Sequence, residues 1–298
     1  MAHRNFARAH AKINLTLDII GKRPDGYHDL ASIMQTVALY DTILLQDATR
    51  ADLSCFCDVP DLNTFDNLAV RAAQALRAET QAHQSSLRLE IHKDIPFQAG
   101  MGGGSSDAAE VLVALNSLWN PGLSEERLRD LGARLGSDVP FFIRGGTQLI
   151  EGRGEVVTPL PDVEPFWLIL AHPPVPVPTP LVFRNLSPDE WTDGANTRAI
   201  AEEIRLGHTV PWTRLDNALE RTAFRLYPAI QEMRDELVRA GAKVVRMSGS
   251  GPTLFAPFED LERARDILTR ARAAGIPVRL TRTVSAEELR ACRATLHP

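Results

Sequence analysis

Three consecutive glycines, Gly102, Gly103 and Gly104, stand within residues 96–109 and are the strongest chemical signal in this sequence. Glycine has no Cβ, so such a run can adopt positive φ and bring backbone N–H groups close to an anion. Ser105 and Ser106 follow and are predicted to open the capped first turn of a helix, because the apolar residues after them keep helical spacing. The positive end of that helix would face the anion. The segment predicts a phosphate-binding loop, against the alternative of a tight turn without a ligand.

The spacing of the glycines argues against two common nucleotide-binding patterns. The Gly-Lys-Ser/Thr sequence of the nucleotide-hydrolase phosphate loop is absent. The dinucleotide pattern Gly-x-Gly-x-x-Gly is incomplete, because Gly100 and Gly102 fit but Ser105 stands where the third glycine is required. The prediction of a dinucleotide-dependent oxidoreductase would depend on this loop alone, and the spacing of the glycines argues against it.

A lysine and an asparagine near the N-terminus are the next candidates. Residues 12–19 alternate between polar and apolar side chains, which predicts a half-buried strand. Lys12 and Asn14 then project from the same polar side, about 7 Å apart along the strand. Beside a phosphoryl group Lys12 would stabilise negative charge, whereas a lysine at a strand end more commonly extends into water.

Asp138 is the candidate general base. It follows a helix that Ser124 is expected to cap and Gly136 to end, and it precedes a strand-like run at residues 141–143. Its carboxylate could accept the proton of a reacting hydroxyl. On the residues alone, a helix-capping aspartate is the commoner role.

The remaining pattern alternates helices and strands. A helix is expected about 67–77 and strands near 42–45 and 87–91, and a proline-rich extended connector follows a buried strand that starts at Phe166. Helices about 229–240 and near 261–274, strands 244–247, 253–256 and near 278–283, and the loop 248–252 complete a pattern like half of a split βαβ sandwich.

Composition sets outer limits on the function. The chain has 298 residues, enough for two domains, and its 44% hydrophobic and 24% charged residues are ordinary for a globular protein. No apolar run approaches the roughly 20 residues of a membrane span. A net charge of −5 argues against nucleic acid as a partner. Three cysteines and the lack of a targeting segment predict a cytoplasmic protein.

Three distant segments together resemble the motifs of the GHMP small-molecule kinases. They are residues 12–14, the glycine loop 96–109 and the loop 248–252, in that order and spacing. Within this superfamily, residues 11–15, 23–28, 102–109, 135–141 and 178–183 are similar to the family that phosphorylates cytidine diphosphate-linked methylerythritol. The Asp-Gly-Tyr-His element at 25–28 is the part that other members would not share. Phe97 and Gln98 depart from the small residues or glycine that the family usually carries there.

This resemblance, which covers nearly the whole chain, implies an α+β fold with two lobes. The ATP-binding lobe, residues 1–158, would resemble ribosomal S5 domain 2, and the substrate lobe, residues 159–298, would be ferredoxin-like, with the active site between them. The implied reaction transfers the γ-phosphoryl of ATP, carried with Mg²⁺, to the 2-hydroxyl of the cytidyl-linked methylerythritol in non-mevalonate isoprenoid biosynthesis. The oligomeric state and any protein ligands of the metal are not indicated.

The resemblance also assigns roles to residues. Asp138 would be the base, and Lys12 would keep it ionised and stabilise charge on the transferred oxygens. Tyr27, His28 and Phe183 would form the pocket for the cytosine ring, although without the family an exposed loop and a core aromatic would explain them. The loop 248–251 would brace the glycine loop. The expected ATP-binding residues are Pro96, Gly100, Gly102, Gly103, Gly104, Ser105, Ser106, Asn67 and Lys93, and the expected substrate-binding residues are Asn14, Tyr27, His28, Thr179 and Phe183.

Two alternatives stay open at this point. Another kinase of the superfamily could act on a mevalonate-type alcohol, homoserine or a sugar, but such a substrate has no pyrimidine that would need Tyr27, His28 and Phe183. A catalytically silent ATP-binding sensor could lose Lys12 or Asp138 freely, and this chain keeps both.

Overall fold

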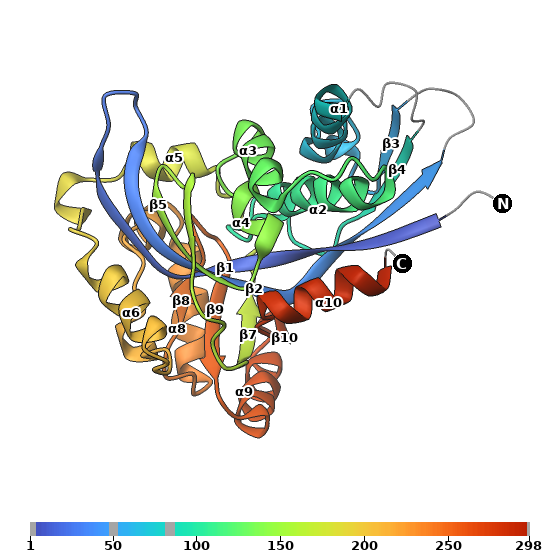
Figure 1. Ribbon diagram of the computed structural model, residues 1–298. Coiled ribbons are helices and arrows are strands. Elements are labelled where there is room, and N and C mark those ends of the chain that lie inside the picture. The colour runs from blue at the N-terminus through green and yellow to red at the C-terminus, as the bar shows by residue number, and fades with distance from the viewer. Residues whose placement is uncertain (1–3, 48–52, 81–86, 297–298) are drawn as a thin grey trace.

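The computed structural model describes residues 4–47, 53–80 and 87–296, and its strands form two sheets (Figure 1). The first sheet has the order β3-β4-β2-β5-β6, and β1 pairs with β2 in antiparallel fashion. Its strands are β1 (Arg4–Lys22), β2 (His28–Asp47), β3 (Leu53–Cys57), β4 (Leu87–His92), β5 (Thr147–Gly152) and β6 (Val156–Pro159).

Four helices cover one side of the first sheet. In Figure 1 they lie above the long strands β1 and β2, and their apolar faces share one core cluster with the sheet. They are α1 (Leu68–Thr80), α2 (Gly103–Leu118), α3 (Glu125–Leu135) and α4 (Val139–Arg144), with a short 3-10 turn, η1 (Pro60–Leu62), before α1. The helix α3 begins and ends as predicted, because the Ser124 hydroxyl accepts a bond from the Arg127 N–H and Gly136 is the C-cap.

The second sheet is antiparallel with the order β10-β7-β9-β8, the arrangement of a ferredoxin-like split βαβ lobe. The helices α8 and α9 pack their apolar faces against it. The elements of this lobe are β7 (Trp167–Ala171), α5 (Thr179–Arg184), η2 (Pro188–Glu190), α6 (Ala195–Arg205), η3 (Trp212–Arg214), α7 (Glu220–Leu226), α8 (Pro228–Arg239), β8 (Arg246–Met247), β9 (Leu254–Phe258), α9 (Leu261–Ala273), β10 (Val278–Arg282) and α10 (Ala286–Leu296). The predicted two-lobed α+β fold is confirmed.

A third core cluster joins the lobes, and it corrects the prediction that residues 12–19 form a half-buried strand. Ile13 of β1 packs there with Leu168 of β7 and Phe255 of β9. The polar residues of β1 are buried too, with Lys12 only 3% and Asn14 only 2% exposed. The alternation predicts that the polar face meets water, but the glycine loop and the second lobe cover that face.

The strand β1 changes sides just before the candidate lysine. Its pairing with β2 shifts register between His10 and Lys12. Ala9 packs in the cluster under α1 and α2, whereas Ala11 packs in the cluster between the lobes. Across this register shift β2 advances from Tyr40 to Thr36 while β1 advances only from His10 to Lys12, and the alternation of faces along β1 is interrupted at this irregularity. Lys12 and Asn14 therefore turn toward α2 and the glycine loop.

Two local predictions are wrong. The helix after the glycines begins earlier than expected, at Gly103, with Gly102 as a left-handed N-cap at φ 71°. Residues 141–143 lie in the helix α4 and not in a strand. A short run that is buried on all sides fits either element, and here Pro140 in the first turn favours the helix. No helix within the described ranges is long and apolar enough to cross a membrane.

Candidate active site

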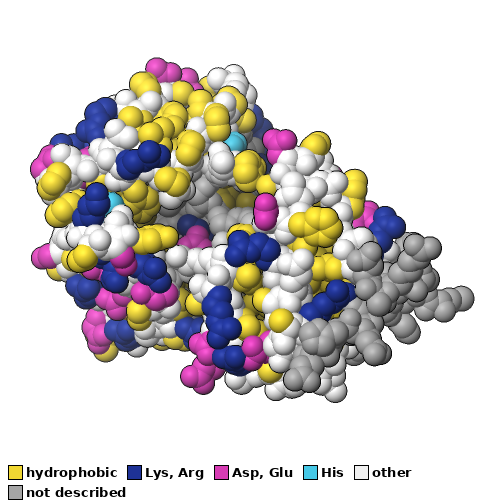
Figure 2. Space-filling view, turned by 90° about the horizontal axis from the view of Figure 1, so that it is seen from above, with side chains coloured by type: hydrophobic (Ala, Val, Ile, Leu, Met, Phe, Trp, Pro, Cys, Tyr) yellow, Lys and Arg dark blue, Asp and Glu magenta, His cyan; other side chains and the backbone are white. Residues whose placement is uncertain are grey.

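A cavity of about 700 Å³ opens between the lobes, and Figure 2 shows the hollow from above. Elements of both lobes line it: β1, the glycine loop, the start of α2, the turn before α4, the helix α5 and the loop after β8. The structure thus brings most of the predicted site residues together. Those that line the cavity are Lys12, Asn14, Asn67, Lys93, Pro96, Gly100, Gly102, Gly103, Gly104, Ser105, Asp138, Thr179 and Phe183.

The glycine loop leaves the start of α2 open to this cavity. Gly102 makes no side-chain cap, and the first turn contains no acidic residue, so the first N–H groups of the helix keep their partial positive charge. Gly102 must be glycine, because a Cβ there would lie 2.7 Å from the Phe142 ring in addition to straining the backbone. Such a helix start is a ready anion site.

The loop after β8 braces the glycine loop from the other lobe, as predicted. The Ser248 hydroxyl donates to the Gly100 carbonyl at 2.9 Å and accepts from the Asn14 N–H at 3.3 Å. A Cβ on Gly100 would lie only 2.1 Å from the Ser248 carbonyl oxygen. Asn217 holds the bracing loop by donating to the carbonyls of Met247 and Gly249. The two lobes therefore fix one backbone surface around the anion site.

Lys12 and Asp138, which are 126 residues apart in sequence, meet at the cavity wall. The Lys12 Nζ lies 3.8 Å from the Asp138 Oδ2 and donates to the Asn14 Oδ1 at 2.6 Å. Asn14 is itself fixed, because its Nδ2 donates to Ser32 at 2.7 Å. Asp138 precedes α4 yet makes no capping bond, and its side chain is 32% exposed. Its carboxylate is therefore available to a ligand.

Burial lowers the pKa of Lys12, and the Asp138 carboxylate opposes this effect. The amide oxygen of Asn14 is a neutral partner, so among the described residues the ammonium is paired with one distant carboxylate only. An incoming phosphoryl oxygen would supply the negative charge that the Lys12 ammonium lacks among its neighbours.

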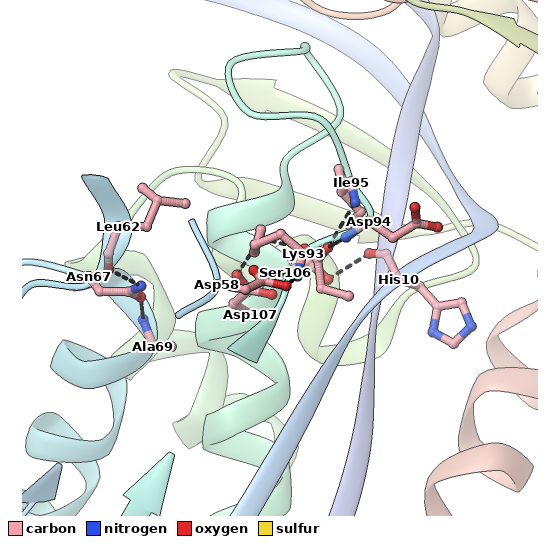
Figure 3. Close-up of polar contacts among 11 residues, drawn as sticks. His10, Asp58, Leu62, Asn67, Ala69, Lys93, Asp94, Ile95, Ser106 and Asp107 are labelled. Atoms are coloured by element: carbon pink, nitrogen blue, oxygen red, sulfur yellow. Dashed lines mark hydrogen bonds and ion pairs between the residues drawn. The ribbon is translucent and has the colours of Figure 1, made fainter. Parts of the chain in front are cut away.

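Lys93 has very different surroundings (Figure 3). Its Nζ donates to Asp107 at 2.6 Å and forms an ion pair with Asp41, and all three side chains are buried. The backbone N–H groups of Asp94 and Ile95 also donate to Asp41. Sequence reasoning missed the pairing with both carboxylates, although an aspartate directly before the predicted strand 42–45 was a usable signal.

Charge is unbalanced in this Asp41–Lys93–Asp107 cluster, because two carboxyl groups share one ammonium. Burial raises the pKa of Asp107 to about 7, against the opposing effect of Lys93. Burial would lower the pKa of Lys93, but the two carboxylates outweigh it and raise that pKa. Burial therefore favours the protonated form of Asp107 at the side of the helix that carries the glycine loop.

Two of the predicted ATP-side residues have clear local roles. The Asn67 Oδ1 accepts from the Ala69 N–H at 2.9 Å and its Nδ2 donates to the Leu62 carbonyl at 2.9 Å, so it shapes the start of α1. The Ser106 hydroxyl donates to the His10 carbonyl at 2.6 Å and lies outside the cavity lining. Of the two serines, the cavity receives Ser105.

The predicted cytosine-binding residues are divided. Phe183 lines the cavity, and the His28 ring packs against it with the ring centroids 5.3 Å apart. Thr179 also lines it and shares a 2.7 Å hydrogen bond with Ser250. Tyr27 is 57% exposed at the turn between β1 and β2, under the guanidinium of Arg153, and lies outside the lining together with His28.

The two lobes and the glycine-loop cavity between them define a class, the GHMP kinases, whose N-terminal and C-terminal domain models match residues 67–146 and 198–277. A 4-diphosphocytidyl-2-C-methyl-D-erythritol kinase of Pelotomaculum thermopropionicum is 41% identical over 93% of this chain and 97% of its own length. One of Geobacter metallireducens is 44% identical over 87% and 90%. The chain belongs to the 4-diphosphocytidyl-2-C-methyl-D-erythritol kinase family, which confirms the resemblance found in its motifs.

Solved structures agree with this assignment. A crystal structure of 4-(cytidine 5'-diphospho)-2C-methyl-D-erythritol kinase matches 95% of this chain and 99% of its own with a TM-score of 0.79 and 34% identity. A homoserine kinase from Cytophaga hutchinsonii matches 95% of both chains with a TM-score of 0.73, but at 18% identity the likeness concerns the fold alone. The alternative readings as another GHMP kinase or a silent sensor are not favoured.

Proposed function

We propose that the protein transfers the γ-phosphoryl group of ATP to the 2-hydroxyl of 4-(cytidine 5'-diphospho)-2-C-methyl-D-erythritol, a step of isoprenoid biosynthesis. Family membership supports the reaction. The observation that carries the assignment of residues is the Lys12–Asp138 pair, 3.8 Å apart in a cavity that also receives the open start of α2.

In the proposed mechanism, the glycine loop binds the phosphates and the pair acts on the acceptor. Phosphoryl transfer requires mainly positioning and charge stabilisation. The acceptor oxygen bonds to the γ-phosphorus while the bond to the leaving β-phosphate oxygen breaks, so that ADP departs. Asp138 accepts the hydroxyl proton and later releases it to water. Lys12 stabilises the charge on the transferred oxygens.

We propose that Mg²⁺ arrives with ATP as part of that substrate. Across residues 4–47, 53–80 and 87–296, no group of three His, Cys, Asp or Glu side chains could hold a metal ion. This fits an ion that keeps several waters and binds mainly through phosphate oxygens. The Ser105 hydroxyl at the cavity wall is the side chain that we assign to the metal or the phosphates.

The remaining site residues are assigned by their position. Asn14 and Thr179 would contact the acceptor, and Phe183, supported by His28, would stack on the cytosine ring. Tyr27 would complete that pocket only if its turn moved toward the cavity. Pro96, Asn67 and Lys93 form the wall that we assign to adenosine, and Lys93 shapes that wall while its ammonium stays paired with Asp41 and Asp107. We keep Ser106 as a support of the phosphate loop through its bond to β1.

The two sheets support a division into an ATP-binding lobe at residues 1–158 and a substrate lobe at residues 159–298, although α10 returns to the first lobe. A small molecule is the proposed partner. We also propose a cytoplasmic location; the thiols of Cys55 and Cys57, which form no disulfide within the described residues, suit a reducing compartment.

The test is phosphate transfer from ATP to the cytidyl substrate, with mevalonate and homoserine as competing acceptors. We expect product with the first acceptor only. Asp138→Asn should lower kcat by about 10²–10⁴-fold, as expected for loss of a general base, and leave ATP binding unchanged. Isothermal titration with a non-hydrolysable ATP analogue measures that binding. Turnover of Asp138→Asn near the wild-type rate would remove Asp138 from its role.

A further inference from the structure

The C-terminal helix α10 carries a guanidinium into the interior of the ATP-binding lobe. In Figure 1 this helix lies beneath β1, and Arg293 comes from its last turn. The Arg293 Nη2 donates to the Glu110 Oε2 of α2 at 2.8 Å and to the Phe142 carbonyl of α4 at 2.9 Å. Its Nη1 donates to the Ile143 carbonyl at 2.6 Å. One side chain therefore contacts both helices whose N-terminal ends form the candidate site.

These contacts are shielded from water. The Arg293 side chain is 12% exposed and that of Glu110 is 2% exposed. The Glu110 Oε1 has no hydrogen-bond partner among the described residues. The guanidinium of Arg293 therefore compensates the negative charge of this buried carboxylate. Removing one partner of such a buried pair leaves an uncompensated charge behind.

The helix α4 is the element that needs this support. It has only six residues, too few to be stable alone, and the last carbonyls of any helix lack partners within it. Arg293 bonds two of those carbonyls. Asp138 stands at the opposite end of the same helix, and the Phe142 ring lies against Gly102 of the glycine loop. A shift of α4 would move the base, whereas the bond from Ser248 to the Gly100 carbonyl holds the glycine loop from the other lobe.

We propose that Arg293 is a positioning residue for phosphoryl transfer, which fixes α4 against α2 so that Asp138 faces Lys12 and the acceptor. This inference rests on the proposed function, because Asp138 must be the base for its position to affect turnover. Arg293 does not line the cavity, so its effect would pass through Asp138.

The experiment compares Arg293→Met with Arg282→Met in steady-state assays. Within the described residues Arg282 bonds Glu288 and Thr283 and reaches neither α2 nor α4, so it controls for general loosening of α10. We expect Arg293→Met to lower kcat by about 10–100-fold, the effect of misplacing a reacting group by about 1 Å, and to change the ATP KM less than twofold. Arg282→Met should stay within twofold in both constants. Wild-type kcat in Arg293→Met overturns the proposal.

A double variant separates positioning from a structural role. If Arg293 acts through Asp138, adding Arg293→Met to Asp138→Asn should lower the residual kcat less than twofold. A further loss as large as in the wild-type background overturns the proposal.

If urea unfolding shows that Arg293→Met is not folded, Arg293→Lys replaces it. Lysine keeps the positive charge but loses the forked hydrogen bonds. The expected kinetic pattern and the result that overturns the proposal are the same. A wild-type enzyme without transfer would instead refute the proposed function.

Discussion

Two buried lysines lie at the wall of the same cavity, and their surroundings are opposite. Lys93 is held by two buried carboxylates, which raise its pKa. Lys12 has a neutral amide at 2.6 Å and one half-exposed carboxylate at 3.8 Å, and burial lowers its pKa. Two carboxylates surround the single positive charge of Lys93, so its neighbours carry excess negative charge. The positive charge of Lys12 is only partly balanced by its neighbours, so Lys12 can bind a further anion.

This difference shows which charge the protein keeps for a ligand. A buried cation that is fully paired exerts little field on a third group, but an underpaired cation attracts the next anion that enters. We therefore interpret the Asp41–Lys93–Asp107 cluster as a fixed support of α2 and Lys12 as the working cation. Three substitutions test this comparison.

Lys93→Met should produce the largest effect, on stability. The change leaves two buried carboxylates without a cation, and breaking a buried pair in this way costs about 3–5 kcal/mol. Urea unfolding measures the loss, and steady-state assays of the folded enzyme should find kcat within a few-fold of wild type. A tenfold rise in the ATP KM with little loss of stability would break the comparison, because Lys93 would then bind the nucleotide directly.

Lys12→Met should produce the second largest effect, on turnover. Loss of one charge that stabilises the transferred oxygens lowers kcat by about 10²–10³-fold. The free energy of unfolding should change little, because methionine buries well and Asp138, at 32% exposure, reaches water. Steady-state assays measure kcat, and urea unfolding measures the free energy of unfolding. A loss of stability as large as that of Lys93→Met would show that the two lysines have the same structural role.

Sequence reasoning predicted the parts of the site that depend on local residue patterns. The glycine run, the Ser124 cap and the Gly136 helix end follow from backbone conformations that few residues adopt. The shared side of Lys12 and Asn14 also followed from the strand period, since the register shift precedes both.

The parts that were missed depend on distant packing. Lys93 pairs with Asp41, from which it is separated by 52 positions in the sequence, and no local pattern specifies that pairing. The burial of both faces of β1 depends on the second lobe. Residues 141–143 are apolar throughout, so their period could not separate helix from strand, and contact with α10 and α2 surrounds them in the fold.

Near pH 5 Asp107→Asn should produce the smallest effect of the three, and this effect depends on pH. The pKa of Asp107 is raised from 3.8 to about 7 by burial, so between these values the folded protein holds a proton that the unfolded chain releases. Asp107 therefore makes the free energy of unfolding fall as pH rises from about 4 to about 7, and contributes no slope above that range. Near pH 5 asparagine resembles the protonated acid, and we expect a difference of about 1 kcal/mol or less.

Above pH 7 the wild-type cluster carries the second carboxylate charge, and the variant does not. Urea unfolding from pH 4.5 to pH 8.5 should give a flatter curve for Asp107→Asn, with its stability relative to wild type rising toward the alkaline end. Asp94→Asn, at an exposed neighbour of the cluster that pairs with Arg279, is the matched control and should keep the wild-type slope. Parallel curves for Asp107→Asn and wild type would mean that both carboxylates stay ionised throughout. Lys93 would then neutralise two charges at once, and its contrast with Lys12 would be sharper still.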